Sequence, residues 1–135
     1  KKKKMFGKWW CLINMKIVDA NIVLRYLLND IEELAERATN IIEDNEVLVP
    51  NEVIAEIVYV LEKVYQVRND EIRDTLKELF QYENIKVNDL ELIETALELY
   101  GERRLDFVDT LLYAYNRVRK YEVCTFDKKL NKLLE

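Results

Sequence analysis

The chain has 135 residues, of which 50% are hydrophobic and 35% are charged, and it contains no histidine. This length and apolar content suffice for one compact domain with a core, but not for two. The missing histidine excludes Ser–His and Cys–His nucleophilic catalysis as well as histidine-based zinc sites. Carboxylate oxygens, which suit hard divalent cations, are therefore the abundant ligand chemistry in this chain.

The net charge of −5 is unevenly distributed along the chain. Residues 1–14 contain five lysines and no acid, which leaves 16 basic and 26 acidic residues in 15–135, a balance of −10. We interpret 1–14 as a basic leader that is disordered or was added during expression, or as an arm that contacts RNA. The single folded domain is expected to comprise residues 15–135. Its acidic surface would repel nucleic acid unless bound cations or basic patches reverse the local field.

Hydrophobic periodicity divides residues 15–135 into alternating strands and helices. In chain order we expect a strand at Met15–Val18, helices at Asn21–Leu28 and Ile31–Glu43, a strand at Glu46–Val49, helices at Asn51–Tyr65 and Asn69–Tyr82, a strand at Ile85–Val87, helices at Asp89–Gly101 and Asp106–Lys120, a strand at Glu122–Phe126 and a helix at Asp127–Leu134. Gly101 is expected to stop its helix. Strands separated by helices predict an α/β fold with a parallel sheet covered on both faces.

The cysteines and the apolar runs bear on the cellular compartment. Cys11 and Cys124 form no C-x-x-C motif, and Cys124, in a strand-like apolar run, is expected to be a reduced, buried thiol. No apolar run is long enough to cross a bilayer, and no signal-peptide pattern fits the start. We therefore expect a cytoplasmic protein without a membrane partner.

Five carboxylates lie at positions where the predicted fold would gather them. Asp19 follows the first strand and Asp127 follows the last, at the edge where the carboxyl ends of parallel strands meet. Asp106 and Asp109 occupy one side of the first turn of their helix because they are three residues apart. Glu56 lies one turn into the helix after the proline, on the border of its apolar arc. The pattern indicates an acidic, metal-holding cluster.

An ordinary structural role is also open for most of these acids. Asp19, Asp106 and Asp127 stand where aspartate commonly caps a helix, and an acid in a first turn favours the helix dipole. Glu56 is in mid-helix and cannot be a cap, so its alternative is pairing with Lys63 or exposure to solvent.

Four segments, in order, carry a family resemblance: MKIVDANIVLRYLLND, VPNEVIAEIVYVL, LDFVDTLLYAYN and VCTFDKKL. Together they resemble the acidic motifs of the PIN-domain family, in particular the VapC-type toxins of toxin–antitoxin pairs. The resemblance implies a three-layer α/β/α sandwich with a central, mostly parallel sheet. It further implies an endoribonuclease whose acids hold Mg²⁺ or Mn²⁺. Family members usually continue into a final edge strand, so the sheet is expected to be one strand short, or the chain truncated, after Glu135.

The resemblance also assigns roles to individual residues and implies partners. Its catalytic and metal-binding acids are Asp19, Glu56, Asp109 and Asp127, its additional metal ligand is Asp106, and its supporting polar residues are Asn21 and Thr125. The implied partners are an RNA substrate, a cognate antitoxin protein and a second copy of the chain in a homodimer. Candidates for steering RNA phosphates toward the ions are Arg25, Arg104, Arg117 and Lys128.

Three other classes of protein compete with the nuclease. A haloacid-dehalogenase-type phosphatase would place a second acid where Asn21 stands, and a response-regulator receiver would need an adjacent acidic pair after the first strand. Both patterns are missing. The principal alternative is a catalytically inactive PIN-like module for protein interaction or RNA binding, against which the intact acids argue.

Overall fold

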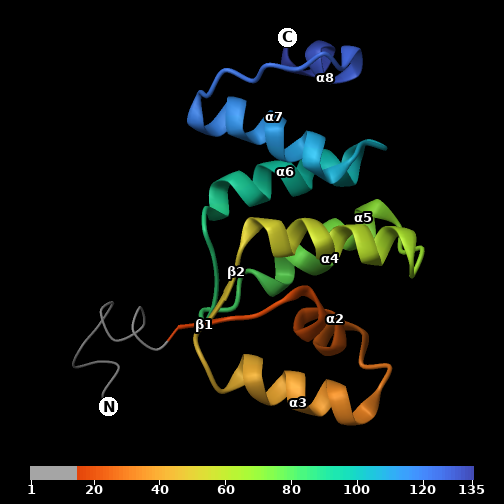
Figure 1. Cartoon of the computed structure of the whole chain (residues 1–135), viewed down its shortest axis with the longest axis vertical. Helices are drawn as coiled ribbons and strands as arrows, with labels where there is room; N and C mark the ends of the chain where they lie inside the picture. Colours follow the sequence, from red (N-terminus) through yellow and green to blue (C-terminus); the bar gives the residue numbers. More distant parts are fainter. Residues whose placement is uncertain (1–14) are drawn as a thin grey trace, which may run out of the picture. The chain divides into compact units, whose positions relative to one another are not determined.

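The computed structural model describes residues 15–135. It contains a parallel sheet of three short strands (Figure 1). The strands are β1 (Lys16–Ile17), β2 (Val47–Val49) and β3 (Ile85–Val87), hydrogen-bonded in the order β1-β2-β3. Both pairs are parallel, and helices separate the strands in sequence. The predicted α/β fold with a parallel sheet is thereby confirmed. The prediction of a basic leader at 1–14 lies outside the described residues.

The chain forms two compact units. Of the described residues, the first comprises 15–57 together with Phe80–Asn88, and the second comprises Val58–Leu79 and Asp89–Glu135. No helix within the described chain has the length and apolar character needed to cross a lipid bilayer.

In the first unit, β2 is the central and most deeply buried strand. Val47 and Val49 are 0% and 1% exposed, because alternate residues of a strand point to the same face of its sheet. The register places Val47 opposite both Lys16 of β1 and Ile85 of β3. The side-chain amide of Asn84, next to β3, donates hydrogen bonds to the carbonyls of Ile42 and Asn45, at 2.6 and 3.1 Å.

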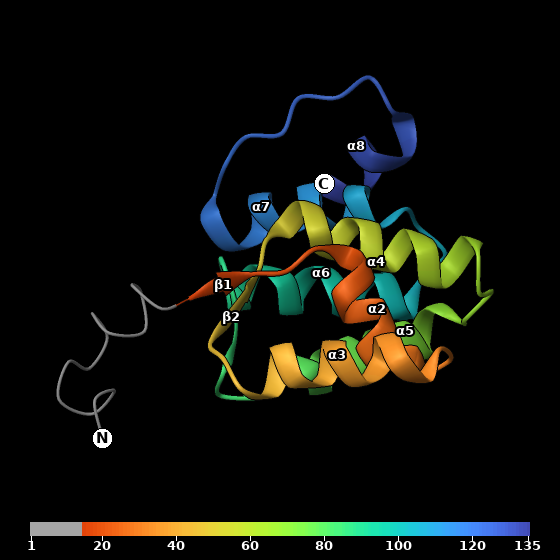
Figure 2. The ribbon, with the colours of Figure 1, turned by 60° about the horizontal axis from the view of Figure 1, so that its bottom comes forward.

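Two helices of the first unit, α2 (Ala20–Leu28) and α3 (Glu32–Glu43), pack against each other (Figure 2). The buried residues of α2 recur on one face and include Val23 and Leu24, while α3 buries the small Ala35. Asn29 caps the C-terminal end of α2, and its φ of 51° is the left-handed conformation that asparagine tolerates. A further helix, α4 (Asn51–Lys63), begins in the first unit and ends in the second.

The second unit is helical. Its remaining helices are α5 (Asn69–Leu79), α6 (Leu90–Glu102), α7 (Phe107–Arg119) and α8 (Lys128–Leu134). Helix α6 packs between α5 and α7, and α8 packs on α7 (Figure 1). The rings of Tyr100 and Phe107 meet edge to face, with centroids 5.7 Å apart. Fully buried aliphatic residues such as Ile72 each contribute about 1.5–3 kcal/mol by leaving water.

Three predicted features of the second unit are wrong. Residues 122–126 form no strand and connect α7 to α8, with Phe126 fully exposed and Cys124 exposed rather than buried. The segment contains residue types that favour strands. Such residues form a strand only when they can pack beside a partner strand, and within the described residues this segment has no partner strand. Helix α6 also continues through Gly101 to Glu102. It passes the glycine because Gly101 has no left-handed backbone and instead leaves room for the side chain of Arg73.

Candidate functional site

Two carboxylates lie at the start of α7, and neither caps the helix. Asp106 is at the N-cap position, but its side chain makes no capping hydrogen bond. Asp106 takes part in the helix through its backbone alone: its carbonyl accepts a hydrogen bond from the N–H of Thr110 at 3.1 Å. Asp109 lies in the first turn and is half-buried. The capping role considered for Asp106 is therefore not the one observed, and its carboxylate stays available to a ligand.

The start of α8 contributes the third acid of the second unit. Asp127 caps this helix, with its Oδ1 atom accepting from the N–H of Leu130 at 3.0 Å. The backbone N–H of Asp127 donates to Thr125 Oγ1 at 3.0 Å, and the carbonyl of Thr125 accepts from the Asn131 amide at 2.9 Å. Thr125 thus fixes the backbone that carries the acid. Asp127 Oδ2 makes no hydrogen bond within the described residues.

The three acids of the second unit act on one another electrostatically. Burial raises the pKa of Asp109, and the negative charges of Asp106 and then Asp127 raise that pKa further. Each effect disfavours the ionised carboxylate, and no basic side chain of the described residues offsets them. These three carboxylates are therefore brought into one neighbourhood, where a positive ion would relieve the repulsion.

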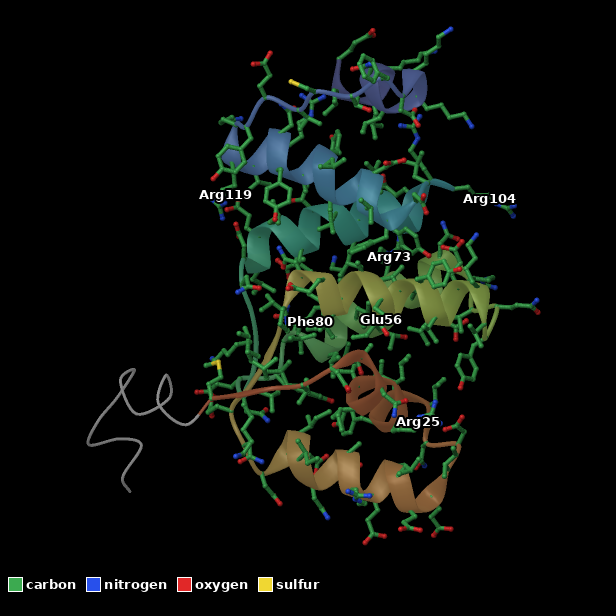
Figure 3. All side chains as sticks on the ribbon, in the orientation of Figure 1. Arg25, Glu56, Arg73, Phe80, Arg104 and Arg119 are labelled. Carbon is green, nitrogen blue, oxygen red and sulfur yellow. The ribbon has the colours of Figure 1, made fainter. Side chains whose placement is uncertain are left out.

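The two acids of the first unit occupy different surroundings. Asp19 caps α2, its Oδ1 atom accepting from the N–H of Ile22 at 3.0 Å. Glu56 is exposed on α4 (Figure 3). Of the two structural alternatives predicted for Glu56, exposure to solvent is the one observed, and Lys63 pairs instead with Glu62 at 3.0 Å. Asn21, the predicted support for Asp19, is exposed in the first turn of α2.

The fit to a divalent metal rests on the chemistry of the donors. Asp106 and Asp109 supply hard carboxylate oxygens, and the raised pKa of Asp109 marks a negative charge that a cation would stabilise. Within residues 15–135, however, no three acids or cysteines lie close enough together to form a metal cage. The donor set fits Mg²⁺ or Mn²⁺, and a shared site for all five predicted acids stays a prediction.

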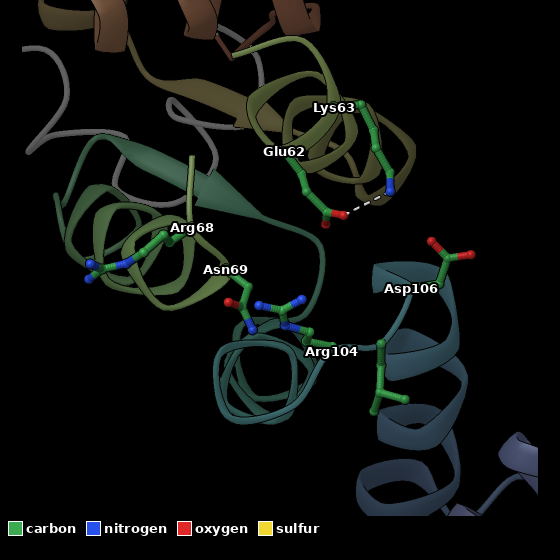
Figure 4. Close-up of a pocket in the computed structure, with 7 residues that line it drawn as sticks. Glu62, Lys63, Arg68, Asn69, Arg104 and Asp106 are labelled. Carbon is green, nitrogen blue, oxygen red and sulfur yellow. Dashed lines mark ion pairs between the residues drawn. The ribbon is translucent and has the colours of Figure 1, made fainter. Parts of the chain in front are cut away.

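A polar pocket of about 480 Å³ borders Asp106, and sequence reasoning did not predict it (Figure 4). Lys63 lies on its wall, and the negative charge of Asp106 contributes to the raised pKa of this lysine, which Glu62 chiefly causes. Arg104 lies beside Asn69 in the same pocket (Figure 4). Periodicity gave no signal for this grouping, because polar positions on exposed helix faces look alike in sequence.

The parallel α/β sheet and the carboxylates at helix starts are accompanied by a family match over nearly the whole chain. Residues 16–134 match the family described as PIN domain, and the chain belongs to this family. It is similar to a VapC ribonuclease of Aquifex aeolicus (strain VF5), with 29% identity over 125 residues that cover 88% of this chain and 92% of that protein. No solved structure matches the chain. The family resemblance seen in the four acidic segments is thereby confirmed.

Proposed function

We propose that this protein is a metal-dependent endoribonuclease that hydrolyses RNA phosphodiester bonds, and the toxin of a VapBC-type toxin–antitoxin pair. The observation that carries the proposal is the acidic group of the second unit, in which Asp106 and Asp127 raise the pKa of Asp109. Membership of the PIN-domain family and the similarity to a VapC ribonuclease support it.

The proposed catalytic and metal-binding residues are Asp19, Glu56, Asp109 and Asp127, with Asp106 as an additional ligand. When bound, Mg²⁺ or Mn²⁺ supplies a Lewis acid that activates water and offsets negative charge on the phosphate. Asp109 contributes a half-buried carboxylate with a raised pKa, and that positive charge would stabilise its ionised form. Glu56, exposed on α4, binds the ion or orients the attacking water.

Two polar residues position the acids in this proposal. Thr125 holds the backbone of Asp127 through the hydrogen bond from the Asp127 N–H. That arrangement leaves Asp127 Oδ2 for the ligand, while Oδ1 caps α8. Asn21 is assigned to orient Asp19, as the family resemblance implies.

Metal-dependent RNA cleavage is the direct test. The purified chain would be incubated with structured transfer, ribosomal and messenger RNA fragments in Mg²⁺, in Mn²⁺ and in EDTA. Asp109→Asn is expected to lower the cleavage rate about 100-fold or more, since even indirect support of a metal ligand is worth 10–100-fold. Asp44→Asn, the same change at an exposed acid outside the site, serves as the control.

Each outcome of this test is informative. Cleavage that needs the metal and is lost only in Asp109→Asn supports the nuclease. If the folded parent protein cuts none of the RNAs in either metal, the proposal fails and a non-catalytic interaction or RNA-binding module takes its place.

The proposed partners follow from the same assignment. As a cytoplasmic toxin, the protein would pair with a second copy and be neutralised by an antitoxin. A basic antitoxin side chain that enters the acidic group would offset the negative charge of Asp109, as a bound metal ion would. Mixing the chain with its antitoxin should therefore abolish cleavage, and light scattering of the free chain should report a dimer.

A further inference from the structure

A second pocket of the second unit, of about 470 Å³, is lined by four cationic side chains and two leucines. One wall is the connection between α6 and α7, and the other is α8. The lining residues are Arg103, Arg104, Leu105, Lys129, Lys132 and Leu133. We refer to it as the basic pocket. None of the described carboxylates lines it, although acids outnumber bases in the sequence by 26 to 21.

The cations of the basic pocket are not neutralised by the protein. None of the four lining cations forms an ion pair within residues 15–135, whereas Arg68 and Arg119 elsewhere in the unit are paired with Asp70 and Asp89. All four are exposed, and Arg104 extends away from the ribbon (Figure 3). Like charges that converge without a counter-charge repel one another, and an anion bound among them removes that repulsion.

Hydrogen bonds hold both walls of the basic pocket in place. On one side, the amide of Asn69 donates to the carbonyls of Tyr100 and Arg103, at 2.9 and 3.2 Å. On the other, the guanidinium of Arg117 donates to the carbonyl of Leu133 at 3.3 Å, and Leu130 anchors α8 with 3% of its surface exposed. The backbone that presents the cations is thus fixed before a ligand arrives, which lowers the ordering cost of binding.

The basic pocket adjoins the acidic group. Arg104 also lines the polar pocket that contains Asp106, two residues further along the chain. On the other wall, Lys129 stands two residues after Asp127. The two chain segments that deliver acids to the proposed active site therefore deliver cations to its flank.

We propose that the basic pocket binds a backbone phosphate of the RNA substrate, next to the nucleotides that are cut. This inference rests on the proposed ribonuclease function for the identity of the polyanion. Phosphate binding needs only converging Arg and Lys donors, and arginine can contact a phosphate through two N–H groups at once. Arg clusters also recognise acidic peptides, and it is the position of the basic pocket beside the acids of the proposed active site that selects RNA as the ligand.

RNA binding in EDTA tests the proposal apart from cleavage. Fluorescence anisotropy with a labelled single-stranded RNA would be recorded over a range of salt concentrations. Two variants, Arg104→Gln/Lys132→Gln and Arg103→Gln/Lys129→Gln, each remove one cation from either wall of the basic pocket. Lys16→Gln/Arg37→Gln removes the same charge from exposed positions of the first unit. The melting temperature of each variant verifies that it folds.

Both pocket variants should bind the RNA about tenfold more weakly at low salt. The slope of log affinity against log salt should fall by about 0.7 for each RNA phosphate that the variant no longer neutralises. The control variant should change both the RNA affinity and the salt slope by less than the pocket variants do. Equal weakening in pocket and control variants would reduce the effect to overall charge and overturn the proposal. It is likewise overturned if RNA binding is unchanged while binding of a polyglutamate peptide falls.

The two proposals fail separately. Asp109→Asn should keep its RNA binding while losing cleavage. A parent protein that binds RNA through the basic pocket but cuts nothing would refute the nuclease and leave the phosphate site standing. Cleavage that proceeds unchanged in both pocket variants would refute the phosphate site and leave the nuclease.

Discussion

The hydroxyl of Tyr100, on α6, donates a hydrogen bond to the carboxylate of Glu62, near the end of α4. Tyr100 is 1% exposed, so this is a buried donor meeting a charged acceptor at the edge of the polar pocket that borders Asp106. The hydrogen bond is the main cause of the lowered pKa of Glu62. It ties the part of α4 that carries Lys63 to the helix that leads into the acidic group.

Tyr100→Phe should destabilise the protein by about 1.5–3 kcal/mol, the usual worth of a hydrogen bond to a charged group. Chemical denaturation at pH 7 measures this loss. Tyr59→Phe is the matched control, because Tyr59 is 62% exposed. In a Glu62→Gln background the loss from Tyr100→Phe should be smaller, since the acceptor is then neutral. Equal stability of parent and Tyr100→Phe would show that the hydrogen bond contributes nothing.

Asp89 and Arg119 should make stability depend on pH. The guanidinium of Arg119 donates two hydrogen bonds to Asp89, both at 2.6 Å, and this pairing is the chief cause of the lowered pKa of Asp89. A folded-state pKa below the unfolded value adds stability that is present above the unfolded pKa of about 3.9. That stability is lost as the pH falls through the folded pKa.

Asp89→Asn isolates this pH dependence. The difference in unfolding free energy between parent and variant should be constant from pH 7 to about 5 and then shrink as the solution is acidified. Measuring the difference cancels the other titrating groups. A difference that does not change down to about pH 2 would contradict the assigned pairing.

Local features of the sequence were predicted well because their causes are local. Strand β3 has the predicted bounds Ile85–Val87, and Asp19 and Asp127 cap helices as their positions indicated. An aspartate cap depends on residues two or three positions away, which the sequence displays directly. The same holds for the family motifs, each of which is a short run around one or two of the predicted acids.

Features that depend on distant residues could not be predicted in the same way. The strand expected at residues 122–126 and the burial of Cys124 both required a partner that the segment lacks within the described chain. The hydrogen bond of Tyr100 with Glu62 joins residues 38 apart, and no periodicity encodes which exposed glutamate meets which tyrosine. The basic pocket could not be predicted for the same reason, although Arg104 is among the residues expected to steer RNA.

Divalent metal should stabilise the protein. Mg²⁺ or Mn²⁺ that binds the folded chain alone raises the unfolding free energy by about 2.7 kcal/mol at one hundred times the dissociation constant. The melting temperature should therefore rise with added metal and return to its starting value with EDTA. Asp19→Asn and Asp109→Asn should each lose most of the gain, and Asp44→Asn should keep it. No shift in the parent protein would refute a metal site in the acidic group.

The effect of Gly101→Ala on stability should depend on whether Arg73 is present. Alanine is favoured over glycine inside a helix by about 1 kcal/mol, and Gly101 lies within α6. A methyl group there would collide with the side chain of Arg73, which pairs with Asp74 at 2.9 Å. In the parent the substitution should give little gain or a loss, because Arg73 must move. In an Arg73→Ala background it should stabilise by about 1 kcal/mol. Denaturation of the four proteins measures the coupling, and equal effects in both backgrounds would rule out the close packing of Arg73 on Gly101.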